Sequence, residues 1–74
     1  MRTREWEPVV RALLHLGCQA FGEDDYHVRV VRGAMRWTAV RKMPISAQRQ
    51  REILDILELS EVEWGDALRT VGDS

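Results

Sequence analysis

The chain has 74 residues, of which 45% are apolar and 31% are charged. This length suits one hydrophobic core and is too short for two, so we expect a single domain over residues 1–74. The composition is that of a globular protein and excludes a wholly disordered chain. The net charge of −1, taken alone, argues against binding to nucleic acid.

The number of cysteines and the hydropathy of the chain further limit the class of protein and its compartment. Cys18 is the only cysteine, which excludes an intrachain disulfide and suits a reducing compartment. One cysteine and two histidines do not give the ligand spacing of a structural zinc site, and we expect neither metal nor cofactor. Residues 1–6 lack the apolar core of a signal peptide, and no apolar run approaches membrane-spanning length. We therefore expect a cytoplasmic protein with no membrane partner.

The charges are distributed unevenly along the chain. Residues 1–51 contain ten Lys and Arg against five Asp and Glu, a net charge of +5. Residues 52–74 contain one Arg against seven acidic residues, a net charge of −6. A basic segment of this kind can bind a polyanion. Charge alone, however, favours the simpler interpretation of two solvated faces of opposite sign.

The N-terminal part predicts a helix followed by a short strand. Apolar residues recur at helical spacing up to Leu16. Because Pro8 is tolerated only in a first turn, we expect the helix to begin at residue 7 or 8. Gly17 is a typical stop signal for this helix. A short strand at about 18–22 and a turn then lead into the central part of the chain.

The central part of the chain is predicted to form a β-hairpin. Two runs of alternating polarity, at about 26–32 and 35–41, flank Gly33-Ala34. A glycine at the first central position suits a two-residue type II′ turn. With this turn, Val30 faces Trp37 across the hairpin.

The hairpin has two chemically different faces, because strand side chains alternate with period two. One face is apolar and needs a helix packed against it. It consists of Tyr26, Val28, Val30, Met35, Trp37 and Ala39. The other face is polar and contains His27, Arg29, Arg36 and Thr38. Moving the turn to Arg32-Gly33 changes the cross-strand partners but leaves both faces intact.

Two further helices complete the pattern. Ser46 is a predicted N-cap for a helix that continues through Leu57. Ser60 and Glu63 have the spacing of a capping box at the start of a third helix, from about 61 to 70. The expected order is α-β-β-β-α-α, an α+β fold whose helices cover one face of a three-stranded antiparallel sheet.

One set of residues has the order and spacing of a known family. The first helix ends in Gly17-Cys18, and His27 stands ten residues after this glycine on the second strand. The later positions of the pattern are Ile53-Leu54, Leu59-Ser60 and Trp64. Over roughly residues 4–68 the chain therefore resembles a HicA-type toxin, the small mRNA-cleaving partner of a HicB antitoxin. The resemblance implies a fold like that of a double-stranded RNA-binding domain.

The resemblance also implies an activity and a partner. The activity would be metal-independent cleavage of mRNA, neutralised by a HicB-like antitoxin. RNA carries its own nucleophile, the 2′-OH, so His27 would take up its proton as a general base. Arg29 and Arg36 would bind the scissile phosphate and stabilise its developing charge. The expected RNA-binding residues are Arg29, Arg36, Thr38, Arg41 and Lys42.

The chain departs from the family pattern at four positions. Asp25-Tyr26 stands where the family has Gly-Ser, Val28 stands in place of a second histidine, and Ala39 stands in place of a proline. These departures leave open a second interpretation, a HicA-like fold without catalysis that binds RNA or a protein partner. The sequence carries no signal of oligomeric state.

Overall fold

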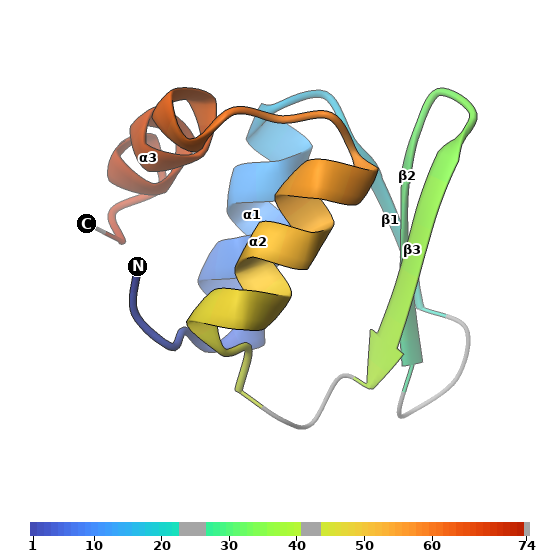
Figure 1. Ribbon diagram of the computed structural model, residues 1–74, viewed down its shortest axis with the longest axis horizontal. Helices are drawn as coiled ribbons and strands as arrows, with labels where there is room; N and C mark the ends of the chain where they lie inside the picture. The colour runs from blue at the N-terminus through green and yellow to red at the C-terminus, as the bar shows by residue number, and fades with distance from the viewer. Residues whose placement is uncertain (23–26, 41–43, 74) are drawn as a thin grey trace.

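The computed structural model describes residues 1–22, 27–40 and 44–73. Its elements follow the order α-β-β-β-α-α (Figure 1), which confirms the predicted α+β fold class. The elements are α1 (Trp6–His15), β1 (Gln19–Gly22), β2 (His27–Arg32), β3 (Met35–Val40), α2 (Ala47–Ile56) and α3 (Glu61–Thr70).

The strands form one antiparallel sheet in the order β1-β2-β3. The Gly33-Ala34 turn joins β2 to β3. Gly33 has a φ of 61°, whereas Ala34 is not in the left-handed region. A type II′ turn needs a positive φ at its first central position alone. The predicted pairing of Val30 with Trp37 is confirmed.

The described helices lie on one side of the sheet (Figure 1). α1 and α2 contact the strands, and α3 contacts α1. The indole of Trp6, in the first turn of α1, lies 5.7 Å from the indole of Trp37 on β3, measured between ring centroids. Val28 and Val30 of β2 are buried in the same core. The helices therefore cover the predicted apolar face; the place predicted for Tyr26 on it lies outside the described residues.

Some element boundaries differ from the predicted ones by one or two residues. α1 begins at Trp6, so Pro8 is the third helical residue, where an N–H has no intrahelical partner. α2 ends at Ile56, with Leu57 as its C-cap. β1 begins after Cys18, because the Cys18 N–H donates a hydrogen bond to the Leu13 carbonyl at the end of α1 (3.0 Å) and so belongs to the helix terminus. The predicted outer ends of the hairpin strands, residues 26 and 41, lie outside the described residues.

Both predicted serine N-caps are present. The Ser46 Oγ accepts a hydrogen bond from the Arg49 N–H at 3.2 Å. The Ser60 Oγ accepts one from the Glu63 N–H at 3.1 Å. Each bond satisfies an N–H that has no partner within its helix. Among the described residues, the Glu63 carboxylate accepts no bond from the Ser60 N–H, so only half of the predicted capping box forms.

The three described helices end in the same backbone motif. The residue after each C-cap is left-handed: Gly17 (φ 87°), Glu58 (φ 56°) and Gly72 (φ 86°). The next N–H then returns to a carbonyl of the last helical turn, as from Leu59 to Leu54 at 2.8 Å. This is the Schellman motif. A left-handed glutamate at the second of these sites is unusual, because its Cβ crowds the backbone.

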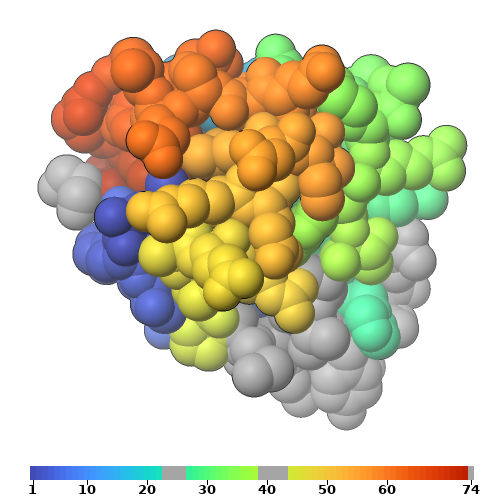
Figure 2. Space-filling model, in the orientation of Figure 1, coloured from blue at the N-terminus to red at the C-terminus, as the bar shows by residue number. Residues whose placement is uncertain are grey.

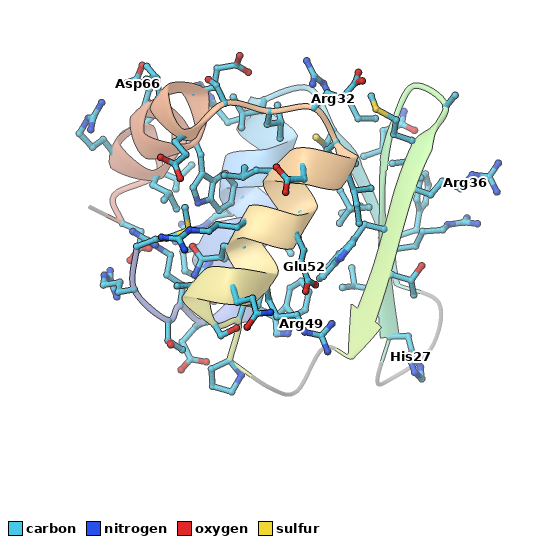
Figure 3. The ribbon with its side chains drawn as sticks, viewed as in Figure 1. His27, Arg32, Arg36, Arg49, Glu52 and Asp66 are labelled. Carbon is cyan, nitrogen blue, oxygen red and sulfur yellow. The ribbon has the colours of Figure 1, made fainter. Side chains whose placement is uncertain are left out.

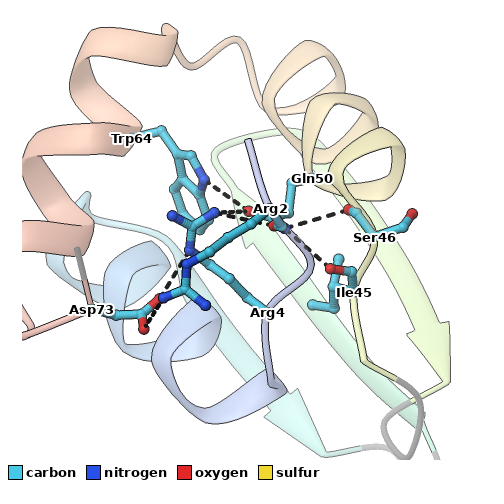
Figure 4. A network of polar contacts seen from close by, with 7 residues as sticks. All are labelled: Arg2, Arg4, Ile45, Ser46, Gln50, Trp64 and Asp73. Atoms are coloured by element: carbon cyan, nitrogen blue, oxygen red, sulfur yellow. Dashed lines mark hydrogen bonds and ion pairs between the residues drawn. The ribbon is translucent and has the colours of Figure 1, made fainter.

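A buried amide joins the N-terminal segment to α2 and α3 (Figure 4). The Gln50 Nε2 donates hydrogen bonds to the carbonyls of Arg2 (2.6 Å) and Ile45 (3.1 Å). The Gln50 Oε1 accepts from Arg4 Nη1 (2.9 Å) and Trp64 Nε1 (3.3 Å). Both donors and both acceptor positions of the amide are used, so its burial leaves no polar atom unpaired.

The same network brings the two ends of the described chain together. Arg2 Nη2 lies 2.8 Å from Asp73 Oδ1, and Arg4 Nε lies 2.9 Å from Asp73 Oδ2. Arg4 and Ile45 also form an antiparallel bridge through two backbone hydrogen bonds, with N to O distances of 2.9 and 2.7 Å. Figure 2 shows the N-terminal segment (blue) lying against α2 and α3.

We expect Trp37→Ala to lower the free energy of unfolding by about 3–5 kcal/mol, because it empties a large site in the core. The Trp37 side chain is 7% exposed. Chemical denaturation measures the loss. The matched control is Thr38→Ala, one residue along β3 and exposed on the opposite face, which should change stability by less than about 0.5 kcal/mol. A loss below about 1 kcal/mol for Trp37→Ala would contradict this packing.

Replacing Glu58 with glycine should stabilise the protein by about 0.5–1 kcal/mol. Glycine adopts the left-handed conformation without a Cβ penalty, and the change removes a negative charge from the C-terminal end of α2. Urea denaturation tests this expectation. Glu58→Ala removes the same charge but keeps the Cβ, so it should give a smaller gain. Loss of stability in Glu58→Gly would show that the glutamate is not strained.

Candidate nucleic-acid interface

The candidate site is the side of the sheet opposite the described helices. We call this surface the open face. Its described side chains are Gln19, Phe21, His27, Arg29, Val31, Arg36 and Thr38. The antiparallel register aligns Phe21, Arg29 and Thr38 in one row across the three strands. Strand parity therefore brings residues from all three strands onto a single surface.

The structure places four of the predicted site residues on the open face. They are His27, Arg29, Arg36 and Thr38. Arg36 and Thr38 are exposed, whereas His27 and Arg29 are half-buried. Figure 3 shows the His27 and Arg36 side chains pointing away from the helices. Side chains of β3 (green) project from the same side in Figure 2. Arg41 and Lys42, the other two predicted RNA-binding residues, lie outside the described residues.

His27 is a close neighbour of Arg29 but not of Arg36. His27 and Arg29 are two residues apart on β2, which corresponds to about 7 Å along the strand. Arg36 pairs with Val31, four residues from His27. The rows of His27 and Arg36 are therefore about 13 Å apart. Arg29 is therefore close enough to His27 for both to contact one small ligand group, whereas Arg36 lies farther along the sheet.

Phe21 belongs to the open face although it was not among the predicted site residues. Phe21 lies on β1 directly opposite Arg29, and its relative solvent exposure is 43%. The Arg29 Cζ lies 5.3 Å from the centroid of the Phe21 ring, a cation–π contact. The signal was available in principle, because alternation in β1 places Phe21 on the face opposite Ala20. The run was too short, however, to fix its register against β2.

Arg32, the last residue of β2, has a structural role on the side of the sheet that faces the helices. Arg32 Nη1 donates hydrogen bonds to the carbonyls of Leu57 (2.6 Å) and Glu58 (2.9 Å). These groups lie at the C-terminal end of α2, where a cation is favourable. Figure 3 shows Arg32 at the end of the hairpin, well away from His27. The open face therefore has two guanidinium groups, and its described side chains include no carboxylate.

The acidic residues of the second half of the chain lie on α2, α3 and the segments that follow these helices. Asp66 on α3, for example, is on the side of the molecule away from the sheet (Figure 3). The net negative charge among these elements lies on α3, because Arg49 and Arg51 balance the two acidic residues of α2. The described fold thus places α3 away from the cationic open face. This separation favours binding of an anion on the open face.

Within 1–22, 27–40 and 44–73, no three His, Cys, Asp or Glu side chains are grouped so that they could hold a metal ion. In the same ranges, no helix is long and apolar enough to cross a membrane.

Comparison of the chain with protein-family models, curated proteins and solved structures found no match. The resemblance to HicA-type toxins therefore rests on the residues and spacings of the sequence itself.

The buried Cys18 thiol is expected to make the free energy of unfolding fall at alkaline pH. Burial raises the pKa of this thiol above its ordinary value of 9.0, and the nearby Arg32 acts in the opposite direction. Because the folded pKa is the higher one, the contribution of Cys18 to stability is fully present below the unfolded pKa. It is lost as the pH rises through the folded pKa.

We therefore expect the stability difference between wild type and Cys18→Ala to shrink above about pH 9. The measurement is urea denaturation of both proteins in reducing buffer at neutral and alkaline pH. The alanine variant is the reference for all other groups that titrate in this range. A difference that stays constant, or grows with pH, would contradict a raised thiol pKa.

Proposed function

We propose that the open face binds RNA and that His27 makes the chain a metal-independent endoribonuclease, a HicA-like toxin that cleaves mRNA. The observation that supports this proposal is the placement of His27 beside Arg29 on the open face. Arg36 extends the cationic surface along the sheet, and Thr38 adds a hydroxyl group.

The proposed chemistry needs few protein groups, because RNA supplies the nucleophile. His27 takes the proton of a 2′-OH, and the 2′-oxygen attacks the adjacent phosphorus. The bond from phosphorus to the 5′-oxygen breaks, and this oxygen leaves with a proton from water. The hydroxide that remains takes the proton from His27, which returns to its neutral form. The products are a 2′,3′-cyclic phosphate and a free 5′-OH. The Arg29 guanidinium binds the phosphate oxygens while negative charge develops on them.

A toxin of this kind would have a protein partner and would act in the cytoplasm. A HicB-like antitoxin would neutralise the protein by covering the open face, so that RNA and antitoxin compete for His27 and Arg29. An acidic antitoxin surface would complement the two guanidinium groups. The substrate, mRNA, places the reaction in the cytoplasm.

A second candidate function is RNA binding without cleavage. The open face offers one described imidazole, that of His27, and no described carboxylate that could protonate the leaving oxygen. Asp25-Tyr26, which replaces the family's Gly-Ser, lies outside the described residues. Two arginines can bind phosphates whether or not cleavage follows.

His27→Ala should abolish cleavage of mRNA by the purified protein, and should abolish growth arrest when the chain is expressed alone. It removes the general base, an effect typically worth about 10²–10⁴-fold in rate. Circular dichroism should show an unchanged fold. The matched control is His15→Ala, because His15 is exposed on α1 and distant from the open face. Cleavage should continue in EDTA.

Arg29→Ala and Arg36→Ala should instead weaken RNA binding. Each should reduce the slope of log K against log salt by about one, because each removes one phosphate contact. Arg69→Ala, which removes an exposed arginine of α3, is the control and should leave the slope unchanged. Wild-type protein that binds RNA but never cuts it would reject catalysis in favour of the second candidate. Wild-type protein that neither binds nor cuts RNA would reject both.

A further inference from the structure

Phe21 is the exposed aromatic residue of the described sheet. The three tryptophans of the chain are buried in the core, between 1% and 9% exposed. Phe21 is 43% exposed and lies on the open face, where it gains little from core packing. An aromatic ring in this position offers a π-surface to a ligand.

The ring is paired with a phosphate-binding group. Arg29 lies opposite Phe21 in the sheet register, and its Cζ lies 5.3 Å from the ring centroid. A nucleotide carries a flat base and an anionic phosphate a short distance apart. The ring and the guanidinium together match these two features, because aromatic rings stack on bases and arginine binds phosphate.

We propose that Phe21 is a stacking platform for an unpaired base and that the substrate of the open face is single-stranded RNA. This proposal rests on the proposed RNA-binding function and specifies its substrate. In a duplex, neighbouring base pairs cover both faces of each base, so a base cannot stack on a protein ring without leaving the helix. Stacking would be tolerant of base identity, since every base has a π-surface.

The position of Phe21 relative to His27 supports the same substrate. The row of Phe21 and Arg29 is two residues along β2 from His27, about 7 Å away. The stacked base would therefore belong to a nucleotide close to the cleaved bond. Attack by a 2′-oxygen needs the leaving oxygen on the opposite side of the phosphorus, an orientation that a flexible single strand can reach. Anchoring one base beside His27 limits this flexibility to productive orientations.

The test uses the full chain with His27→Ala as background, so that RNA stays intact during titration. The probes are a short single-stranded RNA containing 2-aminopurine and the same strand annealed to its complement. Fluorescence anisotropy measures affinity, and 2-aminopurine emission reports stacking. Three changes are added to the background: Phe21→Leu, Phe21→Tyr and, as the control, Leu14→Ala. Leu14 is 50% exposed on α1, outside the open face.

We expect the background protein to bind the single strand more tightly than the duplex and to quench 2-aminopurine. Phe21→Leu should weaken single-strand binding by about 5- to 140-fold, the range that alanine substitution gives for loss of one base–aromatic stack. It should also abolish quenching and leave duplex binding unchanged. Phe21→Tyr retains the ring and should bind within about twofold of the background protein. Leu14→Ala should have no effect.

The outcomes separate this proposal from the function on which it rests. If the single strand and the duplex bind equally well, or Phe21→Leu binds like the background protein, the stacking platform is rejected while RNA binding stands. If the background and wild-type proteins bind neither probe, RNA binding itself is rejected, and the platform with it.

Discussion

The packing of Trp37 against Trp6 is the contact on which the rest of the structure depends. It turns one face of the hairpin toward α1, and strand alternation then fixes the face of every other residue in β2 and β3. A slip of one residue in β3 would expose the indole and turn Arg36 and Thr38 toward the core. The burial that stabilises the fold is therefore the same event that assembles the open face.

Polar contacts complete the fold on the helical side of the sheet. Gln50 joins the N-terminal segment to α2 and α3, and Asp73 holds Arg2 and Arg4 beside it. Arg32 connects the hairpin to the C-terminal end of α2 through two hydrogen bonds. A domain of this length has a small core, so such contacts matter for its stability. Arg36 and Thr38 on the open face, by contrast, are exposed side chains that the core does not need.

The parts of the fold that follow from local chemistry could be predicted from the sequence. Alternation predicted the two faces of the hairpin, Gly33 predicted its turn to within one residue, and Ser46 and Ser60 predicted two helix starts, because each depends on neighbours in sequence. The left-handed Glu58 could not be predicted, since it depends on burial of Leu59 and on Arg32 at its carbonyl. Phe21 was missed for a similar reason: its partner Arg29 comes from another strand.

The open face also constrains any chemistry that it performs. His27 and Arg29 stand close enough to serve one phosphate, whereas Arg36 stands about 13 Å along the sheet. Because the open face has one described imidazole and no described carboxylate, departure of the 5′-oxygen would depend on water, and a general base alone would give slow cleavage. A slow enzyme gains most from holding each substrate in a reactive orientation. In the proposed mechanism this task falls to Phe21 and Arg36, and a partner that covered the open face would keep RNA away from these residues as well as from His27 and Arg29.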